Sequence, residues 1–169
     1  MEVLEALKTR RSIRKYTEQK ISEKDIIEIL TCAMYSPSAF DKQPWHFVVI
    51  DKKKLFDDIL KVATHAEMIR EASHAIIICG DKNLEENDGL LIQDISAVTE
   101  NVLLAAHSLG LGAVWVGIYP FNDIEKGMKK LFNIPEHIVP VSIVVIGYPA
   151  EKPEQPNRYK AERVHSNKW

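Results

Sequence analysis

The residues best suited to bind a charged ligand in this chain of 169 residues are three arginines and a serine near its N-terminus. They are Arg10, Arg11, Ser12 and Arg14. An arginine side chain presents a rigid fork of N–H donors that suits phosphate and polarised carbonyl oxygens. The same cations could instead complement the dipole at the C-terminus of a preceding helix. The segment therefore predicts either an anion-binding site or an ordinary helix end.

A second candidate segment runs from Ser36 to Trp45, where small residues precede Gln-Pro-Trp and a predicted strand. Small side chains such as those of Ser38 and Ala39 would let the backbone approach a flat ligand closely. Taken alone, the segment is typical of a polar turn with a buried tryptophan. We expect Trp45 to be a core residue.

A third candidate segment, from Leu109 to Gly117, contains two glycines after a long predicted helix. Glycine permits a tight helix-to-strand turn. Gly117 would end the strand and leave backbone N–H groups free for a ligand. The alternative is a helix C-cap with no binding role.

Several common catalytic motifs are missing from the sequence. No G-x-G-x-x-G follows a predicted strand, which argues against a dinucleotide-binding Rossmann unit. The glycines from Gly112 to Gly117 have P-loop spacing, but Ile118 and Tyr119 stand where that motif needs Lys and Ser or Thr. No H-E-x-x-H or G-x-S-x-G is present, so neither a zinc site nor a serine hydrolase is predicted.

The order and spacing of the three candidate segments resemble the nitroreductase family. The matching segments are Arg10 to Arg14, Pro37 to Trp45, Leu109 to Gly117, Gly147 to Pro149, and Arg158. The resemblance is specific because five separated segments agree in order over essentially the whole chain.

The resemblance implies an FMN-dependent oxidoreductase. Such an enzyme transfers hydride from NADH or NADPH to a small organic acceptor, such as a nitroaromatic compound or a quinone, by a ping-pong mechanism. A cation 4 Å from the negative charge of the reduced flavin would contribute roughly 4 kcal/mol before desolvation at an effective dielectric near 20. Because the cofactor carries the chemistry, no catalytic side chain and no metal ligand are predicted.

The resemblance also assigns residues to FMN, in a homodimer with the cofactor at the subunit interface. The N-terminal segment would hold the phosphate, ribityl chain and pyrimidine edge, and the tail would add a contact to the phosphate. The small-residue segment of the partner subunit would line one side of the ring, and the 115–117 strand would cover the other. The predicted cofactor-binding residues are Arg10, Arg11, Ser12, Arg14, Pro37, Ser38, Ala39, Gln43, Trp115, Val116, Gly117 and Arg158.

One position departs from the family pattern, because Asp41 stands where the family usually carries Asn. An aspartate side chain cannot donate a hydrogen bond when ionised, and it adds negative charge at the pocket mouth. This change puts the local hydrogen bonds of the segment in question.

Two alternatives to a general reductase remain open at this level. The same fold could carry a specialised reaction, such as dehalogenation, azoline oxidation or flavin breakdown, with specificity set by lid segments at residues 64–73 and 82–90. The chain could also be a flavin-binding protein without turnover, since the arginines and glycines would look the same.

Composition narrows the class of partners and the location. The net charge of −2 gives no global field that would attract nucleic acid or an anionic membrane. The longest apolar stretch, Ile138 to Ile146, is interrupted by Pro140 and is too short to span a bilayer. Cys32 and Cys79 have no metal-ligand spacing, so we expect buried, reduced thiols. These features predict a cytoplasmic protein without a nucleic-acid or membrane partner.

The length of the chain predicts a single domain over residues 1–169. The resemblance implies an α+β fold with a central mostly antiparallel or mixed sheet flanked by helices. By the same resemblance, residues 150–169 would form a C-terminal arm that reaches the partner subunit. Expected helices cover about 3–10, 22–36, 55–63, 89–109 and 122–131. Expected strands cover 46–50, 75–79, 113–117 and 138–147.

Details of three helices and of the tail complete the expectations. Ser22 with Asp25, and Asn122 with Glu125, resemble N-terminal caps. The 89–109 helix is apolar on nearly every side, so it must be buried all round. Its cover could come from a second subunit or from the sheet and helices of its own chain. A terminal Trp169 would be unusual in water, which favours a docked arm.

Overall fold

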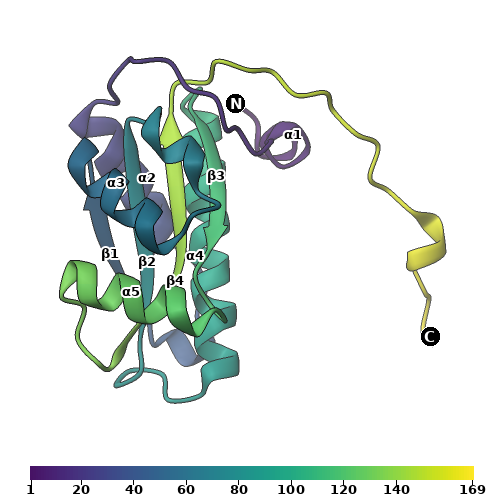
Figure 1. Ribbon diagram of the computed structural model, residues 1–169. Helices are drawn as coiled ribbons and strands as arrows, with labels where there is room; N and C mark the ends of the chain where they lie inside the picture. The colour runs from purple at the N-terminus through teal and green to yellow at the C-terminus, as the bar shows by residue number, and fades with distance from the viewer.

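The computed structural model describes all 169 residues and confirms the predicted α+β architecture around one antiparallel sheet (Figure 1). The four strands lie in the order β1-β2-β4-β3. Their bounds are Trp45–Ile50 for β1, His74–Asp81 for β2, Gly112–Gly117 for β3 and Ile138–Gly147 for β4. Every neighbouring pair is antiparallel, with a register shift in β2 between Ile78 and Cys79.

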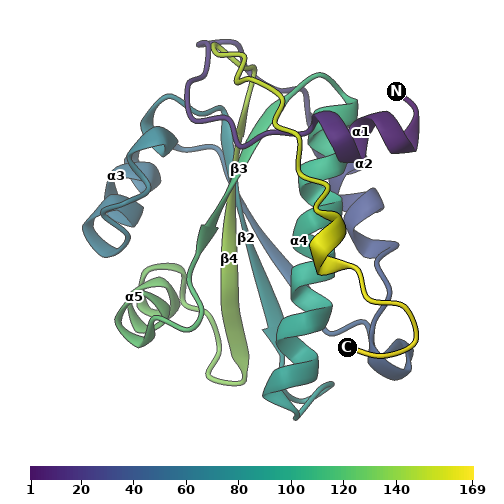
Figure 2. The same ribbon diagram turned by 90° about the vertical axis from the view of Figure 1, so that its right-hand side faces the viewer.

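Helices cover both faces of the sheet. Helices α3 and α5 lie on one face, and α2 and α4 lie on the other (Figure 2). The bounds are Val3–Thr9 for α1, Glu23–Met34 for α2, Lys53–Val62 for α3, Asp88–Ser108 for α4 and Asn122–Phe132 for α5. Short 3-10 turns occur at Ala39–Asp41, Glu67–Arg70 and Ala161–Arg163.

The two central strands separate two apolar cores. In β2, Ile76 and Ile78 face α2 and α4, whereas Ile77 and Cys79 face α3 and α5. Side chains alternate between the faces of a strand, so a strand covered on both faces needs a continuous apolar run. This explains why residues 75–79 contain no polar side chain.

One predicted cap is confirmed and one is wrong. Ser22 Oγ accepts a hydrogen bond from the backbone N–H of Asp25 at 3.1 Å and caps α2. Helix α5 begins at Asn122 itself, with Phe121 at the N-cap position and no side-chain cap. Its stability comes from packing of its apolar face, including the buried Met128, and not from a capping residue.

Helix α4 is covered mainly by its own chain. Its fully buried apolar residues, Leu91, Ile95, Val98 and Val102, pack in the core that α4 shares with α2 and the sheet. Other apolar residues, such as Leu104, are only partly covered. By length and composition alone α4 could cross a membrane, but this packing is that of a core helix. Of the two expected sources of cover, the sheet and helices of the same chain therefore supply most of it.

The C-terminal segment leaves the body of the molecule as an extended arm (Figures 1 and 2). It is anchored where it starts, by a bridge between Tyr16 and Pro149 and by a hydrogen bond from Ala150 N to Lys15 O at 2.9 Å. Trp169 at its end is fully exposed, beside the ring of His165. The end of the arm is therefore not docked on the body of its own chain, and its contact with a partner stays a prediction.

One of the two expected lid segments belongs to the core. Within residues 64–73, Ala66, Ile69 and Ala72 are fully buried in the cluster under α3. The 64–73 segment cannot open without exposing these side chains, so its assignment as a lid is wrong. Residues 82–90 form the turn after β2 and the start of α4.

Candidate functional site

The predicted arginine segment lies between the end of α1 and the edge strand β3. Arg10 is the C-cap residue of α1. Ser12 then forms an isolated parallel bridge with Ala113, and Ile13 N donates to Ala113 O at 3.0 Å. The buried Ile13 side chain anchors the segment in the core. The backbone of residues 10–13 is thus fixed against the sheet.

Two of the arginine side chains are held in defined positions. Arg10 Nε lies 3.4 Å from Glu100 Oε1 on α4. The Arg11 guanidinium donates to the backbone carbonyls of Arg10, of Lys8 at 2.8 Å and of Glu154 at 3.4 Å. None of these carbonyls carries a formal charge, so the positive charge of Arg11 is not neutralised by a carboxylate.

These arginines meet the tail in one open cavity of about 610 Å³, which we call the basic cavity. Lys8, Arg10, Arg11 and Arg158 supply its charged lining. The remaining lining residues are neutral, and no carboxylate is among them. Residues almost 150 positions apart in the sequence thus create a concentrated positive charge, in a protein whose net charge is −2.

Arg14 and Ser12 lie outside the lining of the basic cavity. The side chain of Arg14 points into solvent, and its backbone N–H donates to Glu151 Oε1 at 2.5 Å. The structure therefore brings together Arg10, Arg11 and Arg158 of the predicted set, and places Arg14 apart from them.

The positive charge of Arg10 and Arg11 also acts on a histidine that the sequence analysis did not single out. His107 in the last turn of α4 lies 2.8 Å from Thr9 Oγ1 through its Nε2. Burial lowers the pKa of His107, and the positive charges of Arg10 and Arg11 lower it further. The sequence places His107 in the last turn of the predicted 89–109 helix, but it does not show that this turn faces α1.

The predicted small-residue segment forms a tight loop over residues 37–43. Ser38 Oγ accepts from Gln43 N at 2.9 Å, and Gln43 Nε2 donates to Asp41 Oδ1 at 2.8 Å. Phe40, Asp41 and Gln43 have positive φ values of 53°, 55° and 50°. Such residues are uncommon, and clusters of them occur mainly at functional sites.

Asp41, which stands where the family usually carries Asn, contributes to the structure of the loop. Aspartate tolerates the left-handed conformation better than most residues, and here its carboxylate accepts the amide hydrogen of Gln43. Pro37 is exposed, whereas Ser38 and Ala39 are half-buried. The loop thus retains its internal hydrogen bonds with an acid in place of the amide.

The three β3 residues of the predicted site face different ways. Trp115 is 37% exposed and Gly117 is half-buried, but the Val116 side chain packs in the core with α3 and α5. The Val116 side chain is therefore not available to a ligand, and only its backbone could make the predicted contact, which stays a prediction. Trp45 is buried, as expected.

One chain does not assemble all the predicted residues into a single cavity. The basic cavity contains neither the 37–43 loop nor Trp115, Val116 and Gly117. The 37–43 loop and the three β3 residues thus lie outside the cavity that the arginines form with the arm.

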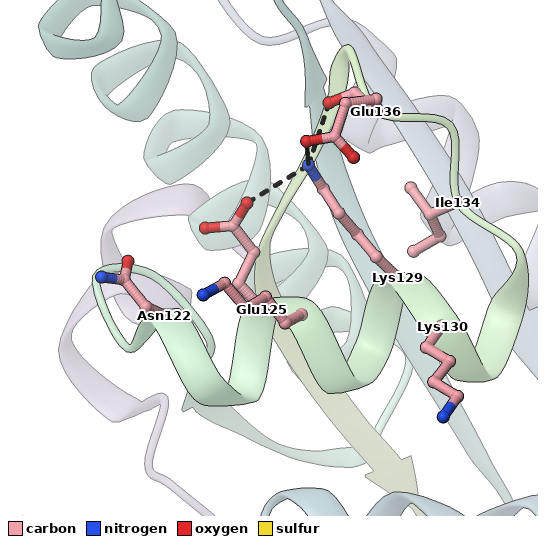
Figure 3. A pocket seen from close by; sticks show the side chains of 7 residues that line it. Asn122, Glu125, Lys129, Lys130, Ile134 and Glu136 are labelled. Carbon is pink, nitrogen blue, oxygen red and sulfur yellow. Dashed lines mark hydrogen bonds and ion pairs between the residues drawn. The ribbon is translucent and has the colours of Figure 1, made fainter.

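A second cavity rich in cations lies on α5, at a different place in the fold (Figure 3). Its volume is about 420 Å³. Here Lys129 Nζ lies 3.3 Å from Glu125 Oε1 and 2.9 Å from the backbone carbonyl of Glu136, as the dashed lines in Figure 3 mark. We call it the α5 cavity, and it contains none of the predicted site residues.

Comparison with known proteins gives a consistent match over the whole chain. The family model described as "Nitroreductase family" matches residues 7–72 and 59–148. A Methanothermobacter thermautotrophicus protein named "Putative NADH dehydrogenase/NAD(P)H nitroreductase" is 48% identical over 169 residues, which cover 100% of this chain and 88% of that protein.

Solved structures agree with the sequence match. An FMN-dependent nitroreductase from Clostridium difficile R20291 superposes with a TM-score of 0.91 at 30% identity, over 99% of this chain and 100% of that one. A Desulfovibrio desulfuricans protein described as "a putative nitroreductase in complex with fmn" has a TM-score of 0.85 at 29% identity, over 100% and 98%.

Proposed function

The chain belongs to the nitroreductase family, and we propose that it oxidises NADH or NADPH and reduces a small organic acceptor such as a nitroaromatic compound or a quinone. FMN, when bound, supplies the acceptance and release of hydride. The names of the relatives, which specify NAD(P)H, nitroreductase and FMN, support this assignment. The observation that carries it in this chain is the basic cavity with its four cations and no carboxylate.

The residues of the basic cavity fit the dianionic phosphate of FMN. Guanidinium groups bind phosphate oxygens through short, charge-assisted hydrogen bonds. Arg11 uses backbone carbonyls as its partners and therefore keeps its net charge for an incoming anion. Arg158 would add a cation from the arm, and Lys8 one from α1. Glu100 orients Arg10 without lining the cavity.

The other predicted residues would complete the site around the ring. Trp115 offers an exposed aromatic surface on β3, and Gly117 exposes backbone at the end of that strand. Ser12 lies beside β3 through its bridge to Ala113, so it connects the two groups. The site needs no protein acid or base, because these residues bind, orient and exclude water while the cofactor carries the redox chemistry.

A homodimer would bring the 37–43 loop of one copy to the basic cavity of the other. The apolar side chains of Val3, Leu4 and Leu7 on α1 are exposed in the single chain, as is Trp169 on the arm. Exposed apolar patches of this kind mark interaction surfaces. We expect a particle of twice 19.3 kDa by sedimentation. A flavin-loaded monomer would contradict the shared site.

The two substrates would use one site in turn, which is the ping-pong scheme. No nucleic acid or membrane partner is required by this scheme, and two free thiols suit a reducing, cytoplasmic location. Parallel lines in double-reciprocal plots at several acceptor concentrations would be the expected kinetic pattern. Intersecting lines would require both substrates to bind together.

The direct experiment measures turnover with purified protein. With FMN added, NADH or NADPH should be oxidised when a quinone or a nitroarene is supplied, and heat-denatured protein should give no rate. Stoichiometric FMN binding without any oxidation of either nicotinamide would favour the flavin-binding alternative. Failure to bind FMN at all would refute the proposed function.

A further inference from the structure

Two buried carboxylates of the α4 region hold the 37–43 loop from both ends. Asp94 on α4 is 6% exposed, and its Oδ1 accepts the backbone N–H of Ala39 at 2.9 Å. Glu85, in the turn before α4, is 2% exposed and lies 3.0 Å from Lys42 Nζ. The first contact fixes the start of the loop, and the second fixes its end.

Asp94 has one oxygen with a partner and one without. Its second oxygen, Oδ2, is buried and has no hydrogen-bond partner. The residues before and after it on the inner side of α4, Leu91 and Ile95, are fully buried apolar side chains. A carboxylate oxygen without a partner in such surroundings opposes folding. The contact to the 37–43 loop is therefore the one polar contact of the Asp94 side chain.

The backbone between the two contacts is in a conformation that needs support. Phe40 and Asp41 lie between Ala39 and Lys42, and both have positive φ. The Phe40 side chain is 86% exposed, so burial does not offset the strained backbone. Strained residues persist where the surrounding structure over-determines them. Here the fixed points are the hydrogen bond to Asp94 and the ion pair to Glu85.

We propose that Asp94 and Glu85 are positioning residues, which hold the 37–43 loop in the shape that FMN binding requires. This inference rests on the proposed function, because the loop is the part of the chain expected to line the flavin ring from the partner subunit. Neither carboxylate belongs to the predicted cofactor-binding set, and each acts through a loop residue, Ala39 or Lys42.

The test compares three variants by FMN titration and by the melting temperature of the flavin-free protein. Asp94→Ala removes the acceptor for Ala39 N–H, and it should raise the Kd for FMN about 10-fold, as for loss of a hydrogen bond to a charged group. Its melting temperature should change by no more than about 2 °C, because loss of the hydrogen bond destabilises the fold while loss of the unpartnered oxygen stabilises it. Asp94→Asn keeps an acceptor oxygen and should restore the Kd to within about 3-fold.

The contact between Glu85 and Lys42 is tested by changing its exposed partner, Lys42. Lys42→Gln breaks the ion pair without touching the core and should raise the Kd for FMN about 3-fold. Glu86→Gln is the matched control, since Glu86 is the exposed neighbour of Glu85, and it should leave the Kd unchanged. Lys42→Gln keeps the inference testable if Asp94→Ala does not fold.

Amide hydrogen exchange at Ala39 provides a readout that does not depend on FMN. Asp94→Ala should speed exchange at Ala39, and Asp94→Asn should not. Wild-type affinity together with wild-type exchange in Asp94→Ala would overturn the inference, as would an Asp94→Asn protein as weak as Asp94→Ala. If wild-type protein binds no FMN, the proposed function fails, while exchange at Ala39 still decides whether Asp94 holds the loop.

Discussion

The basic cavity and the α5 cavity are lined by similar numbers of cations, but only the α5 cavity is also lined by carboxylates. In the α5 cavity, Lys129 is 14% exposed and lies between two carboxylates, Glu125 at 3.3 Å and Glu136 at 3.9 Å. In the basic cavity no carboxylate lines the wall, and Arg11 is held by neutral carbonyls. Arg10 alone among its cations has an ion-pair partner, Glu100.

The difference separates charge that stabilises the fold from charge that can bind a ligand. Neighbouring cations without counter-charges repel one another and oppose folding. A protein keeps such an arrangement where function needs it, at the expense of stability. In the α5 cavity, Lys129 is held between two carboxylates and has no charge left to offer an anion. A basic composition therefore does not identify a site until its ion pairs are known.

Removing the unpaired Arg11 should have the largest effect and tests most strongly whether unpaired charge binds the ligand. Arg11→Ala should raise the Kd for FMN about 10- to 100-fold, because charge-assisted contacts to phosphate are lost. The melting temperature of the flavin-free protein should stay within about 2 °C, since one source of repulsion goes as well. Fluorescence titration and calorimetric melting measure both quantities.

Arg10→Ala and Arg14→Ala refine the result. Arg10→Ala should weaken FMN binding less than Arg11→Ala, because Glu100 already offsets part of the charge of Arg10. Arg14→Ala should have a smaller effect, because its side chain lies outside the basic cavity. Unchanged FMN affinity in Arg10→Ala and Arg11→Ala would mean that these cations only complement the dipole of α1.

Salt should weaken FMN binding at the basic cavity, because it screens the attraction between the cations and the phosphate. Raising sodium chloride from 0.05 to 0.5 M shortens the screening length and should weaken FMN binding about 5-fold. Titrations at several salt concentrations give the slope. A Kd that does not change with salt would contradict binding through the phosphate.

The reciprocal change is made in the α5 cavity. Lys129→Ala removes the contacts to Glu125 and to the Glu136 carbonyl, and should lower the melting temperature by about 2–4 °C, as for a loss of about 1 kcal/mol. The Kd for FMN should stay the same. A change in affinity larger than 2-fold would show that the two cavities are coupled.

The smallest expected effect concerns the pH dependence of His107. Its pKa in the folded protein lies below the ordinary value of 6.5, so the neutral ring contributes stability above that pH. This contribution is lost as the pH falls below 6.5, because the unfolded chain takes up the proton first. His107→Asn should remove about 1 °C of the acid-induced decrease in melting temperature. His74, whose pKa burial also lowers, keeps its share in this variant.

Much of the fold followed from local pattern. The apolar run at 75–79, the period of the 89–109 helix and the cap at Ser22 each depend on neighbours within one element, so sequence reasoning could reach them. The expected cap at Asn122 was wrong because tertiary packing, not capping, begins α5. The expected lid at 64–73 was wrong because the apolar side chain of Ile69 turned inward.

The site was predictable in residue type but not in arrangement. Arg10, Arg11 and Arg158 were identified by motif, and the structure brings them together. Asp94 and His107 were missed, because each acts through a contact with a residue far away in the sequence. Single-sequence periodicity carries no information about such pairs.

The central claim is that the basic cavity binds FMN through its phosphate, and calorimetry with two flavins tests it most directly. FMN and riboflavin differ only by that phosphate. The protein should bind one FMN per chain and become yellow, and riboflavin should bind about 100-fold more weakly, as for the loss of two or more charge-assisted hydrogen bonds. Equal affinity for the two flavins, or a protein that stays colourless and gives no heat with FMN, would contradict the account.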